Sequence, residues 1–304
     1  MWLENMNKNE LTGVILIDLR KAFDLVNHGI LLNKLKIYQC DQNAVNWFES
    51  YLSDRKQKVV FEGYESDTKI VKSGVPQGSV LGPLFFLIFM NDLHLGLQHG
   101  ISLDMYADDS TICASGRNIT SVEQKLNQCT PEIVNWCKHN KMVINTEKTK
   151  SMLITTYQKR ATLKDQALRV CIDDTTIEHS TSEKLLGLIV DQNLTWNSHV
   201  KRVHLQTSRN IALLRRIKNF LPLESRILFY NSFIQPYLDY CSAVWDTCPN
   251  STSLHKLQKR AARIILDKHY LEHSTPLFKK LNWIPLPLRF KYRTATLMFR
   301  DYTF

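Results

Sequence analysis

The sequence predicts an α+β fold that is followed by a helical, strongly basic domain. The chain has 304 residues, of which 44% are hydrophobic and 22% charged, enough for one large or two ordinary domains with real cores. Strand-like and helical patterns alternate up to about residue 196, and only helical patterns recur after it. Residues 197–304 carry 18 Lys and Arg against 6 Asp and Glu, whereas residues 1–196 carry 21 against 23. We therefore expect two domains, residues 1–196 and 197–304.

Each strand is predicted from a short apolar or alternating run. The predicted strands lie at residues 14–17, 58–61, 69–71, 103–106, 111–114, 151–155 and 184–190. Residues 58–61 and 69–71 are expected to pair around Gly63, and residues 103–106 and 111–114 to pair with Asp108 and Asp109 at the tip of their hairpin. Strands and helices mixed in this way are typical of an α+β domain.

Helices are predicted where apolar residues recur at helical spacing. In the first domain these segments are residues 30–38, 44–52, 84–93 and 121–140. In the second they are residues 199–220, 224–232 and 253–266, with Pro222 and Pro249 between them. No internal repeat and no low-complexity segment interrupts the pattern.

The cysteines and the apolar runs bear on the cellular compartment. Seven cysteines, an odd number with no C-x-x-C pair, are interpreted as reduced core residues of an intracellular protein. The opening ten residues are mixed and polar, so no signal peptide is expected. The longest apolar run, residues 80–90, is broken by Gly82 and Pro83 and is shorter than the roughly 20 residues that a membrane span needs.

Two groups of carboxylates stand out. Asp18 follows a predicted buried strand, and Asp108 and Asp109 occupy a predicted hairpin tip 90 residues later. Carboxylates at strand ends are costly to bury unless they bind a cation or a partner, and their hard oxygens suit Mg²⁺ or Mn²⁺. Two such ions can activate a hydroxyl and stabilise a leaving oxygen in phosphoryl transfer. The alternative is that Asp108 and Asp109 are ordinary turn residues.

The charge of the second domain has two interpretations. An excess of Lys and Arg attracts phosphate backbones, because binding releases the counterions condensed on nucleic acid. The alternative is a solvated, lysine-rich surface.

Seven segments of the sequence form an ordered set of motifs: residues 18–28 (DLRKAFDLVNH), 73–83 (SGVPQGSVLGP), 106–109 (YADD), 145–150 (NTEKTK), 185–188 (LLGL), 257–265 (LQKRAARII) and 277–288. Taken in this order, they resemble the reverse transcriptases of non-LTR retrotransposons, and of jockey-like mobile elements in particular. The first five resemble the ordered motifs of the polymerase domain, with 185–188 in the place of the primer grip. The resemblance covers nearly the whole chain.

The resemblance implies a right-hand polymerase palm with an antiparallel sheet over residues 1–196 and a helical thumb with an extension over 197–304. It implies an RNA-directed DNA polymerase in which a primer 3′-hydroxyl attacks the α-phosphorus of a deoxynucleotide. The catalytic residues would be Asp18, Asp108, Asp109 and Lys148. Lys148 would protonate or neutralise the leaving pyrophosphate, and Lys150 is the alternative for this role. Two Mg²⁺ ions, or Mn²⁺, would be held by Asp18, Asp108, Asp109 and the main-chain carbonyl of Leu19.

The resemblance also implies binding roles. Phe23 would exclude a ribose 2′-hydroxyl and so select deoxynucleotides, with a core aromatic as the alternative. Gln77 and Gly78 would contact nucleotide and template. One face of the thumb would hold the RNA template, the DNA primer and their hybrid by contacts with the sugar–phosphate backbone. The residues on this face would be Lys201, Arg202, Arg209, Arg215 and Arg216.

Three functional interpretations follow from the sequence. The first is an active polymerase, and the second is an inactive, truncated remnant that only binds nucleic acid, since few residues precede Asp18 and the fingers are expected to be largely missing. The third is a polymerase or nuclease with another template, against which Phe23 and the Ala-Asp-Asp tip argue. The family implies a nuclear or cytoplasmic ribonucleoprotein with no membrane partner, and no targeting signal is seen.

Overall fold

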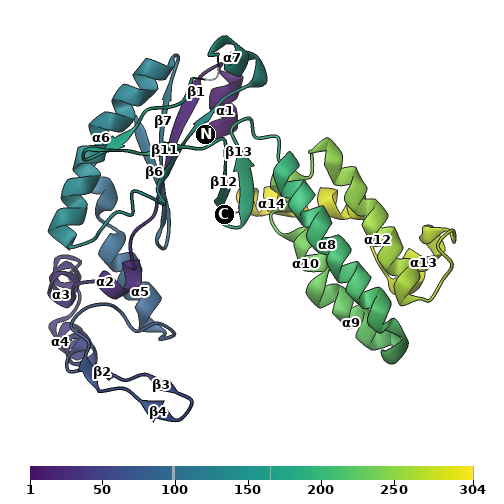
Figure 1. Cartoon of the computed structure of the whole chain (residues 1–304), viewed down its shortest axis with the longest axis horizontal. Helices are drawn as coiled ribbons and strands as arrows, with labels where there is room; N and C mark the ends of the chain where they lie inside the picture. The colour runs from purple at the N-terminus through teal and green to yellow at the C-terminus, as the bar shows by residue number, and fades with distance from the viewer. Residues whose placement is uncertain (98–99, 165, 304) are drawn as a thin grey trace. The chain divides into compact units, whose positions relative to one another are not determined.

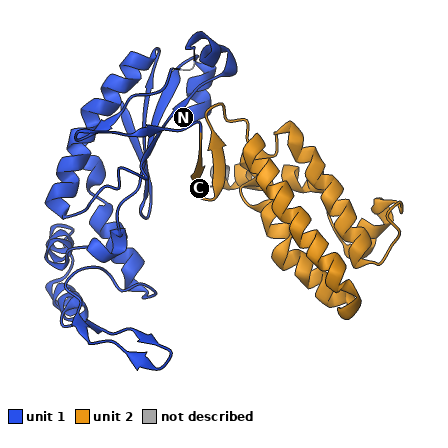
Figure 2. Ribbon diagram, in the orientation of Figure 1, with its two compact units in different colours: residues 1–181 blue, residues 182–304 orange. Residues whose placement is uncertain are grey.

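The computed structural model describes residues 1–97, 100–164 and 166–303, so Phe304, the last residue of the predicted second domain, lies outside it. The chain forms two compact units, residues 1–181 and 182–304 (Figure 2). The predicted boundary, after residue 196, differs because a short hairpin belongs to the second unit. This hairpin packs against the helix that follows it, and the Ile189 amide donates to Nδ1 of His199 at 3.2 Å.

Unit 1 is built on a five-stranded sheet with the order β11-β8-β1-β7-β6. All neighbours run antiparallel except β11 and β8, and β1 lies in the centre between β8 and β7 (Figure 1). The predicted α+β class is confirmed. The strands are β1 (Leu11–Ile17), β6 (Ile101–Tyr106), β7 (Asp109–Gly116), β8 (Lys150–Ile154) and β11 (Glu178–His179), with β9 (Cys171–Ile172) and β10 (Thr175–Thr176) forming a separate small ladder.

Helices pack on this sheet, and their apolar side chains extend its hydrophobic core. The long helix α6 packs on β7 and β1, and three phenylalanines of α5, Phe85, Phe86 and Phe89, are fully buried in the same core. The helices of unit 1 are α1 (Trp2–Asn7), α2 (Ala22–Leu25), α3 (His28–Ile37), α4 (Gln42–Leu52), α5 (Leu81–Met90), η1 (Leu93–Gly96), α6 (Ile119–Asn140) and α7 (Tyr157–Thr162). The predicted long helices are confirmed to within a few residues, and the short ones were not predicted.

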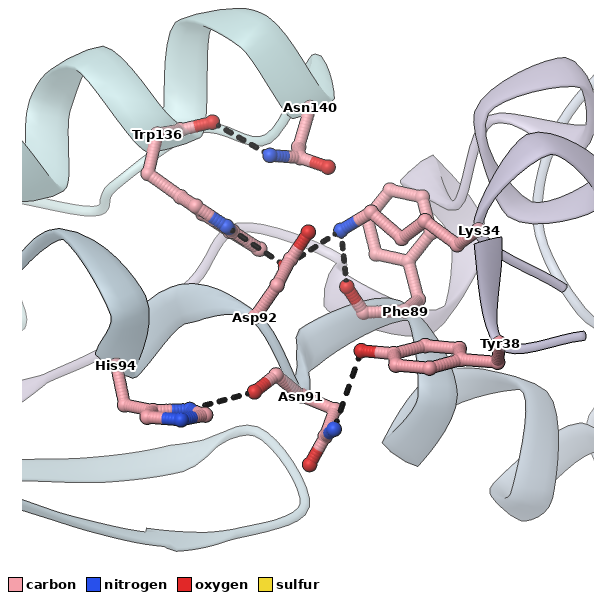
Figure 3. Close-up of polar contacts among 8 residues, drawn as sticks. All are labelled: Lys34, Tyr38, Phe89, Asn91, Asp92, His94, Trp136 and Asn140. Atoms are coloured by element: carbon pink, nitrogen blue, oxygen red, sulfur yellow. Dashed lines mark hydrogen bonds and ion pairs between the residues drawn. The ribbon is translucent and has the colours of Figure 1, made fainter. Parts of the chain in front are cut away.

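An ion pair between the buried Lys34 and the half-buried Asp92 joins three of these helices (Figure 3). Lys34 of α3 donates from Nζ to Asp92 at 2.7 Å and to the Phe89 carbonyl at 2.5 Å, and Trp136 of α6 donates to the same Asp92 oxygen at 2.9 Å. The ammonium also lies over the rings of Phe89 and Trp136. Burial lowers the pKa of Lys34, and the hydrogen bond with Asp92 opposes this shift. The cluster ties α3, α5 and α6 together through Asp92, the residue that precedes η1.

Two predicted β-segments pair differently from expectation. In the segment between α4 and α5, β2 (Lys56–Gln57) pairs with β5 (Lys69–Ile70), and β3 (Val60–Phe61) pairs with β4 (Tyr64–Glu65). The predicted pairing of 58–61 with 69–71 is therefore wrong, because the inner ladder closes tightly on Gly63. The predicted strand 184–190 is instead a hairpin of β12 (Ser182–Leu185) and β13 (Leu188–Asp191), since Gly187 turns the chain.

Beyond its hairpin, unit 2 is helical, as the sequence predicts. Its core contains the fully buried Tyr230 and Trp245, and Arg289 forms a two-pronged ion pair with Asp239 that ties α14 to α10. The helices are α8 (Asn197–Ile217), η2 (Lys218–Phe220), α9 (Leu223–Phe233), α10 (Gln235–Asp239), α11 (Ser242–Trp245), η3 (Pro249–Ser251), α12 (Thr252–Ile265), α13 (Ser274–Leu281) and α14 (Leu286–Thr303).

None of the seven cysteines, all within the described residues, forms a disulfide, and they are not all in the core. Burial raises the pKa of Cys113 to about 11 and those of Cys129 and Cys137 to about 12. Cys171 and Cys241 are exposed, which corrects the prediction for these two. Among the residues that the structure describes, no helix is long and apolar enough to cross a membrane.

Candidate active site

The two groups of predicted carboxylates meet at one edge of the unit 1 sheet. Strands β1 and β7 pair antiparallel up to Ile17 and Ser110, so one further step of this register sets Asp18 across from Asp109. Strands β6 and β7 are joined by a two-residue loop, Ala107 and Asp108, closed by the pair Tyr106 and Asp109. The fold thus brings together carboxylates that are 90 residues apart in the chain.

The loop that carries Asp108 is a strained turn. Ala107 has a φ of 54°, a left-handed conformation that costs a non-glycine residue roughly 1–2 kcal/mol. It is the first loop residue and the one with positive φ, as in a type II′ hairpin turn, where glycine is usual. The turn leaves Asp108 and Asp109 exposed to solvent.

Asp18 is half-buried, and the segment after α6 holds it in place. The side-chain amide of Asn145 donates to Asp18 Oδ2 at 3.0 Å, and its backbone amide donates to the Asp18 carbonyl at 2.8 Å. The buried hydroxyl of Thr149 accepts from the Asp18 amide at 3.2 Å. Both residues lie within the predicted motif 145–150, but contacts across more than 120 positions leave no local sequence pattern that would predict this role.

The main-chain carbonyl of Leu19 faces away from this segment. Leu19 forms an antiparallel bridge with Ile144, and both hydrogen bonds of the bridge are made by its neighbours, Asp18 and Arg20. In an antiparallel pair flanked in this way, the N–H and C=O of the central residue point to the other side. The Leu19 carbonyl is therefore not used by the segment that holds Asp18.

Phe23 is positioned by stacking and by a backbone pair. Its ring stacks on Phe86 with centroids 4.2 Å apart, and its carbonyl accepts from the Val75 amide at 2.9 Å. The side chain is half-buried, so one part packs on the core and another part faces outward. The structure thus brings the first motif against the glycine-rich loop.

That loop is fixed by several contacts to the first motif. Gln77 is exposed and its Nε2 donates to Asp24 Oδ1 at 3.1 Å, while His28 Nε2 lies 2.8 Å from the Gly74 carbonyl. Gly74 has a φ of 90°, and a Cβ on it would lie 2.8 Å from the Asp24 backbone. Gly78 is exposed, with nothing within 4 Å of a Cβ placed on it. His28 thus supports the backbone of this loop.

The two candidate lysines differ in their surroundings. Lys150 lies on β8 and donates to Glu178 at 2.6 Å and to the Glu147 carbonyl at 3.1 Å. Lys148 is exposed, and its backbone belongs to the same turn that begins at Asn145. Of the two ammonium groups, that of Lys148 is therefore the one available to an external anion.

The donors at this edge have the chemistry of a hard-cation site. Asp18, Asp108 and Asp109 supply carboxylate oxygens, and Leu19 supplies a carbonyl, the ligand types that Mg²⁺ prefers. Within the described residues, no three His, Cys, Asp or Glu side chains already converge as a ligand set. The residues fit the ion by donor type, and the exposed tip carboxylates leave space for water and phosphate ligands.

The basic residues predicted to bind nucleic acid lie in unit 2. All five, Lys201, Arg202, Arg209, Arg215 and Arg216, are exposed on α8. The opposite face of α8 is buried through Val200, Val203, Ile211 and Leu214. The helix therefore presents its cations to solvent along its whole length.

The β12–β13 hairpin stands beside these helices. Its two-residue loop has positive φ at both positions, 46° at Leu186 and 85° at Gly187, as in a type I′ turn. Tyr240 donates its hydroxyl to the Leu186 carbonyl at 2.6 Å, and its ring lies 3.3 Å from the position of a Cβ on Gly187. A cavity of about 380 Å³ opens beside this contact, lined by residues that include His199, Arg202 and Tyr237.

The sequence is similar to those of known proteins. Residues 3–191 match the family described as reverse transcriptase (RNA-dependent DNA polymerase). The chain is 27% identical over 292 residues to the probable RNA-directed DNA polymerase from transposon BS of Drosophila melanogaster, covering 92% of this chain and 32% of that protein. It is 28% identical over 276 residues to the RNA-directed DNA polymerase from mobile element jockey of Drosophila funebris, covering 86% of this chain and 29% of that one.

The chain spans about a third of the length of these relatives. Among solved structures, it is similar to telomerase from Candida albicans in complex with the TWJ fragment of telomeric RNA, with a TM-score of 0.48 and 12% identity over 90% of this chain and 49% of that chain.

Proposed function

Because the chain belongs to the reverse transcriptase family, we propose that it is the catalytic part of an RNA-directed DNA polymerase of a non-LTR retrotransposon. The observation that carries the proposal is the shared sheet edge of Asp18 and the Asp108–Asp109 tip. The reaction is attack of a primer 3′-hydroxyl on the α-phosphorus of a deoxynucleotide, with release of pyrophosphate.

The carboxylates and the Leu19 carbonyl would hold two Mg²⁺ ions, or Mn²⁺. When bound, such ions activate the attacking hydroxyl and neutralise charge on the transferred phosphoryl group. The chain contributes orientation: Asn145 and Thr149 fix Asp18, and the strands β6 and β7 fix the tip that carries Asp108.

The other predicted residues line the path of the incoming nucleotide in this proposal. Phe23, held against Phe86, excludes a ribose 2′-hydroxyl by occupying its space. Gln77, tied to Asp24, and Gly78 beside it, with an open backbone, contact nucleotide and template. Lys148 neutralises or protonates the leaving pyrophosphate, because Lys150 is already paired with Glu178.

The partners that fit this activity are an RNA template, a DNA primer and their hybrid, with deoxynucleotides as substrate. The exposed cations of α8 hold the backbone of the hybrid. A polymerase that copies the RNA of its own element would reside in a nuclear or cytoplasmic ribonucleoprotein.

The test is primer extension on an RNA template with Mg²⁺ and deoxynucleotides. Asp108→Ala is expected to lower the rate about 1,000-fold or more, because charge stabilisation worth several kcal/mol is lost. Asp104→Asn is the matched control, since this exposed aspartate lies on the same hairpin and faces Thr111 in the ladder. The control is expected to extend primers at the parent rate with the same thermal midpoint.

Two outcomes would overturn the proposal. Equal extension by the parent and Asp108→Ala would remove the carboxylate tip from the chemistry. Retention of the hybrid without extension by any variant would identify a protein that binds nucleic acid without polymerising it.

A further inference from the structure

A second basic site lies in unit 2, at the far end of α8 from Lys201 and Arg202. It is a pocket of about 510 Å³ between the C-terminal ends of α8 and α12, which pack side by side (Figure 1). The volume is within the roughly 300–1,000 Å³ of small-ligand sites, enough for one nucleotide and too small for a duplex. The lining residues are Arg215, Lys218, Arg260, Arg263, Lys268 and Tyr270, with Ile264 and His269.

The pocket gives a role to the LQKRAARII segment, which the proposed active site does not use. In α12 the apolar members of this segment, Leu257, Ala261, Ala262 and Ile265, are buried in the core. Arg260 and Arg263, three residues apart on the opposite side, face the pocket. The segment therefore builds the core with one face and supplies cations with the other.

Positive charge in the pocket is only partly neutralised. Lys218 pairs with Asp267, and Lys268 lies 3.7 Å from Glu272. Arg215 and Arg260 are exposed and have no acidic partner within ion-pair distance in the described part of the chain. Five cations thus face two carboxylates, and an anion in the pocket would meet two guanidinium groups without competition.

The wall of the pocket is a fixed turn. Asp267, in the left-handed conformation with a φ of 52°, ends α12, and the Lys268 amide donates back to the Arg263 carbonyl at 2.8 Å. The Asp267 amide donates to the Ile264 carbonyl at 3.3 Å, which completes a Schellman motif. The hydrogen bond from Lys218 lowers the pKa of Asp267, so this carboxylate stays charged at neutral pH.

An aromatic side chain stands at the mouth of the pocket. Tyr270 is 72% exposed, and its ring lies next to that of His269 with centroids 4.5 Å apart. Cations that track phosphates, together with an exposed ring on which a base can stack, are the features of sites for single-stranded nucleic acid.

We propose that this pocket binds an unpaired strand of nucleic acid, with a neighbouring base stacked on Tyr270 and a phosphate between Arg260 and Arg215, the residue that the pocket shares with the hybrid-binding face of α8. The choice of nucleic acid rests on the proposed function. The site is separate from the carboxylate edge of unit 1, so its binding can be measured in an Asp108→Ala background in which polymerisation plays no part.

The experiment uses the whole chain and a fluorescein-labelled single-stranded RNA of about 12 nucleotides, within the roughly 4–16 nucleotides that such sites cover. Fluorescence anisotropy gives the affinity for this RNA and for the same RNA annealed to complementary DNA. Arg260→Glu is expected to weaken single-strand binding about tenfold and to lower the salt slope by about 0.7, one phosphate contact. Lys256→Glu, an exposed charge reversal on the same helix outside the pocket, is the control and should change affinity less than about twofold.

Two further variants separate the proposal from misfolding. Asp267→Asn keeps a residue that tolerates the left-handed turn and frees Lys218, so single-strand affinity should rise about threefold. Tyr270→Ala should weaken the single strand about fivefold and leave the hybrid duplex unchanged, because paired bases cannot stack on the ring.

Equal losses for Arg260→Glu and Lys256→Glu would overturn the proposal, since binding would then follow net charge alone. An unchanged or lower affinity for Asp267→Asn would also overturn it. Equal effects of Tyr270→Ala on single strand and hybrid would exclude an unpaired strand as the ligand. None of these outcomes depends on whether the chain extends primers.

Discussion

Each unit presents a hairpin with a two-residue loop, and the two hairpins are supported in different ways. Both begin the loop with a strained non-glycine residue, Ala107 in β6–β7 and Leu186 in β12–β13. Strand β7 also pairs with β1 along seven residues, so the first hairpin is anchored in a five-stranded sheet. The second is a two-stranded ladder of four pairs, too small to be stable alone.

The difference explains where the side-chain contacts are. The tip of β6–β7 is positioned by the pairing of its strands in the sheet, and Asp108 stays exposed to solvent. The β12–β13 hairpin is held from outside, at its tip by the Tyr240 hydroxyl and on strand β13 by His199, which accepts from the Ile189 amide. A hairpin anchored by its strands can present its tip to a ligand, whereas a hairpin anchored at its tip takes its position from the neighbouring helices.

The largest expected effect tests the sheet-anchored side. Asn145→Ala removes the amide that orients Asp18, so kcat for primer extension should fall about 10–100-fold with little change in primer–template affinity. Asn127→Ala is the control, because Asn127 makes comparable bonds to Arg169 and Cys171 away from the site. A loss of activity no greater than that of the control would mean that the sheet alone orients Asp18.

The next effect concerns the turn of the second hairpin. Gly187→Ala forces a side chain into a left-handed position and toward the Tyr240 ring, which should destabilise unit 2 by roughly 1–2 kcal/mol. Urea denaturation followed by tryptophan fluorescence measures this change. The matched change Gly96→Ala, at a glycine with open space around it, should have an effect below about 0.5 kcal/mol.

The third effect concerns the hydrogen bond from the Tyr240 hydroxyl to the Leu186 carbonyl, which one substitution removes and a second can compensate. Tyr240→Phe keeps the ring and loses the bond to Leu186, worth about 0.5–1.5 kcal/mol, and should weaken primer–template affinity about fivefold. Adding Leu186→Asn supplies the Asn-Gly pair that a type I′ turn prefers and should restore the affinity. Failure of the double variant to recover would show that the Tyr240 hydroxyl acts other than through the turn.

The smallest expected effect concerns the strained residue Ala107 in the loop of the β6–β7 hairpin. Ala107→Gly relieves the strain of the left-handed residue but adds freedom to the unfolded chain, so unit 1 should change by less than about 1 kcal/mol, toward stability. Ala212→Gly, at an exposed position inside α8, should cost about 1 kcal/mol instead. A marked loss of stability in Ala107→Gly would contradict the idea that the sheet anchors this tip.

The sequence could predict the first hairpin better than the second. The patterns over residues 103–106 and 111–114 indicated two strands with Asp108 and Asp109 between them. The structure confirms the strands and the loop position of Asp108, whereas Asp109 is the first residue of β7. Residues 184–190 are apolar enough at 185–189 to look like one strand, and the turn within them depends on Tyr240, 54 positions away. The sequence likewise could not predict two contacts that join distant segments. They are the hydrogen bond from Asn145 to Asp18 and the ion pair of Lys150 with Glu178.

The two exposed cysteines provide a means of observing movement. Cys171 lies in unit 1 and Cys241 in unit 2, while the thiols of Cys113, Cys129 and Cys137 are buried and resist ionisation. With the half-buried Cys40 replaced by serine, maleimide spin labels would attach to one native site in each unit. Pulsed electron–electron double resonance could then follow the distance between the two labels through a cycle of nucleotide addition, with no cysteine introduced into the chain.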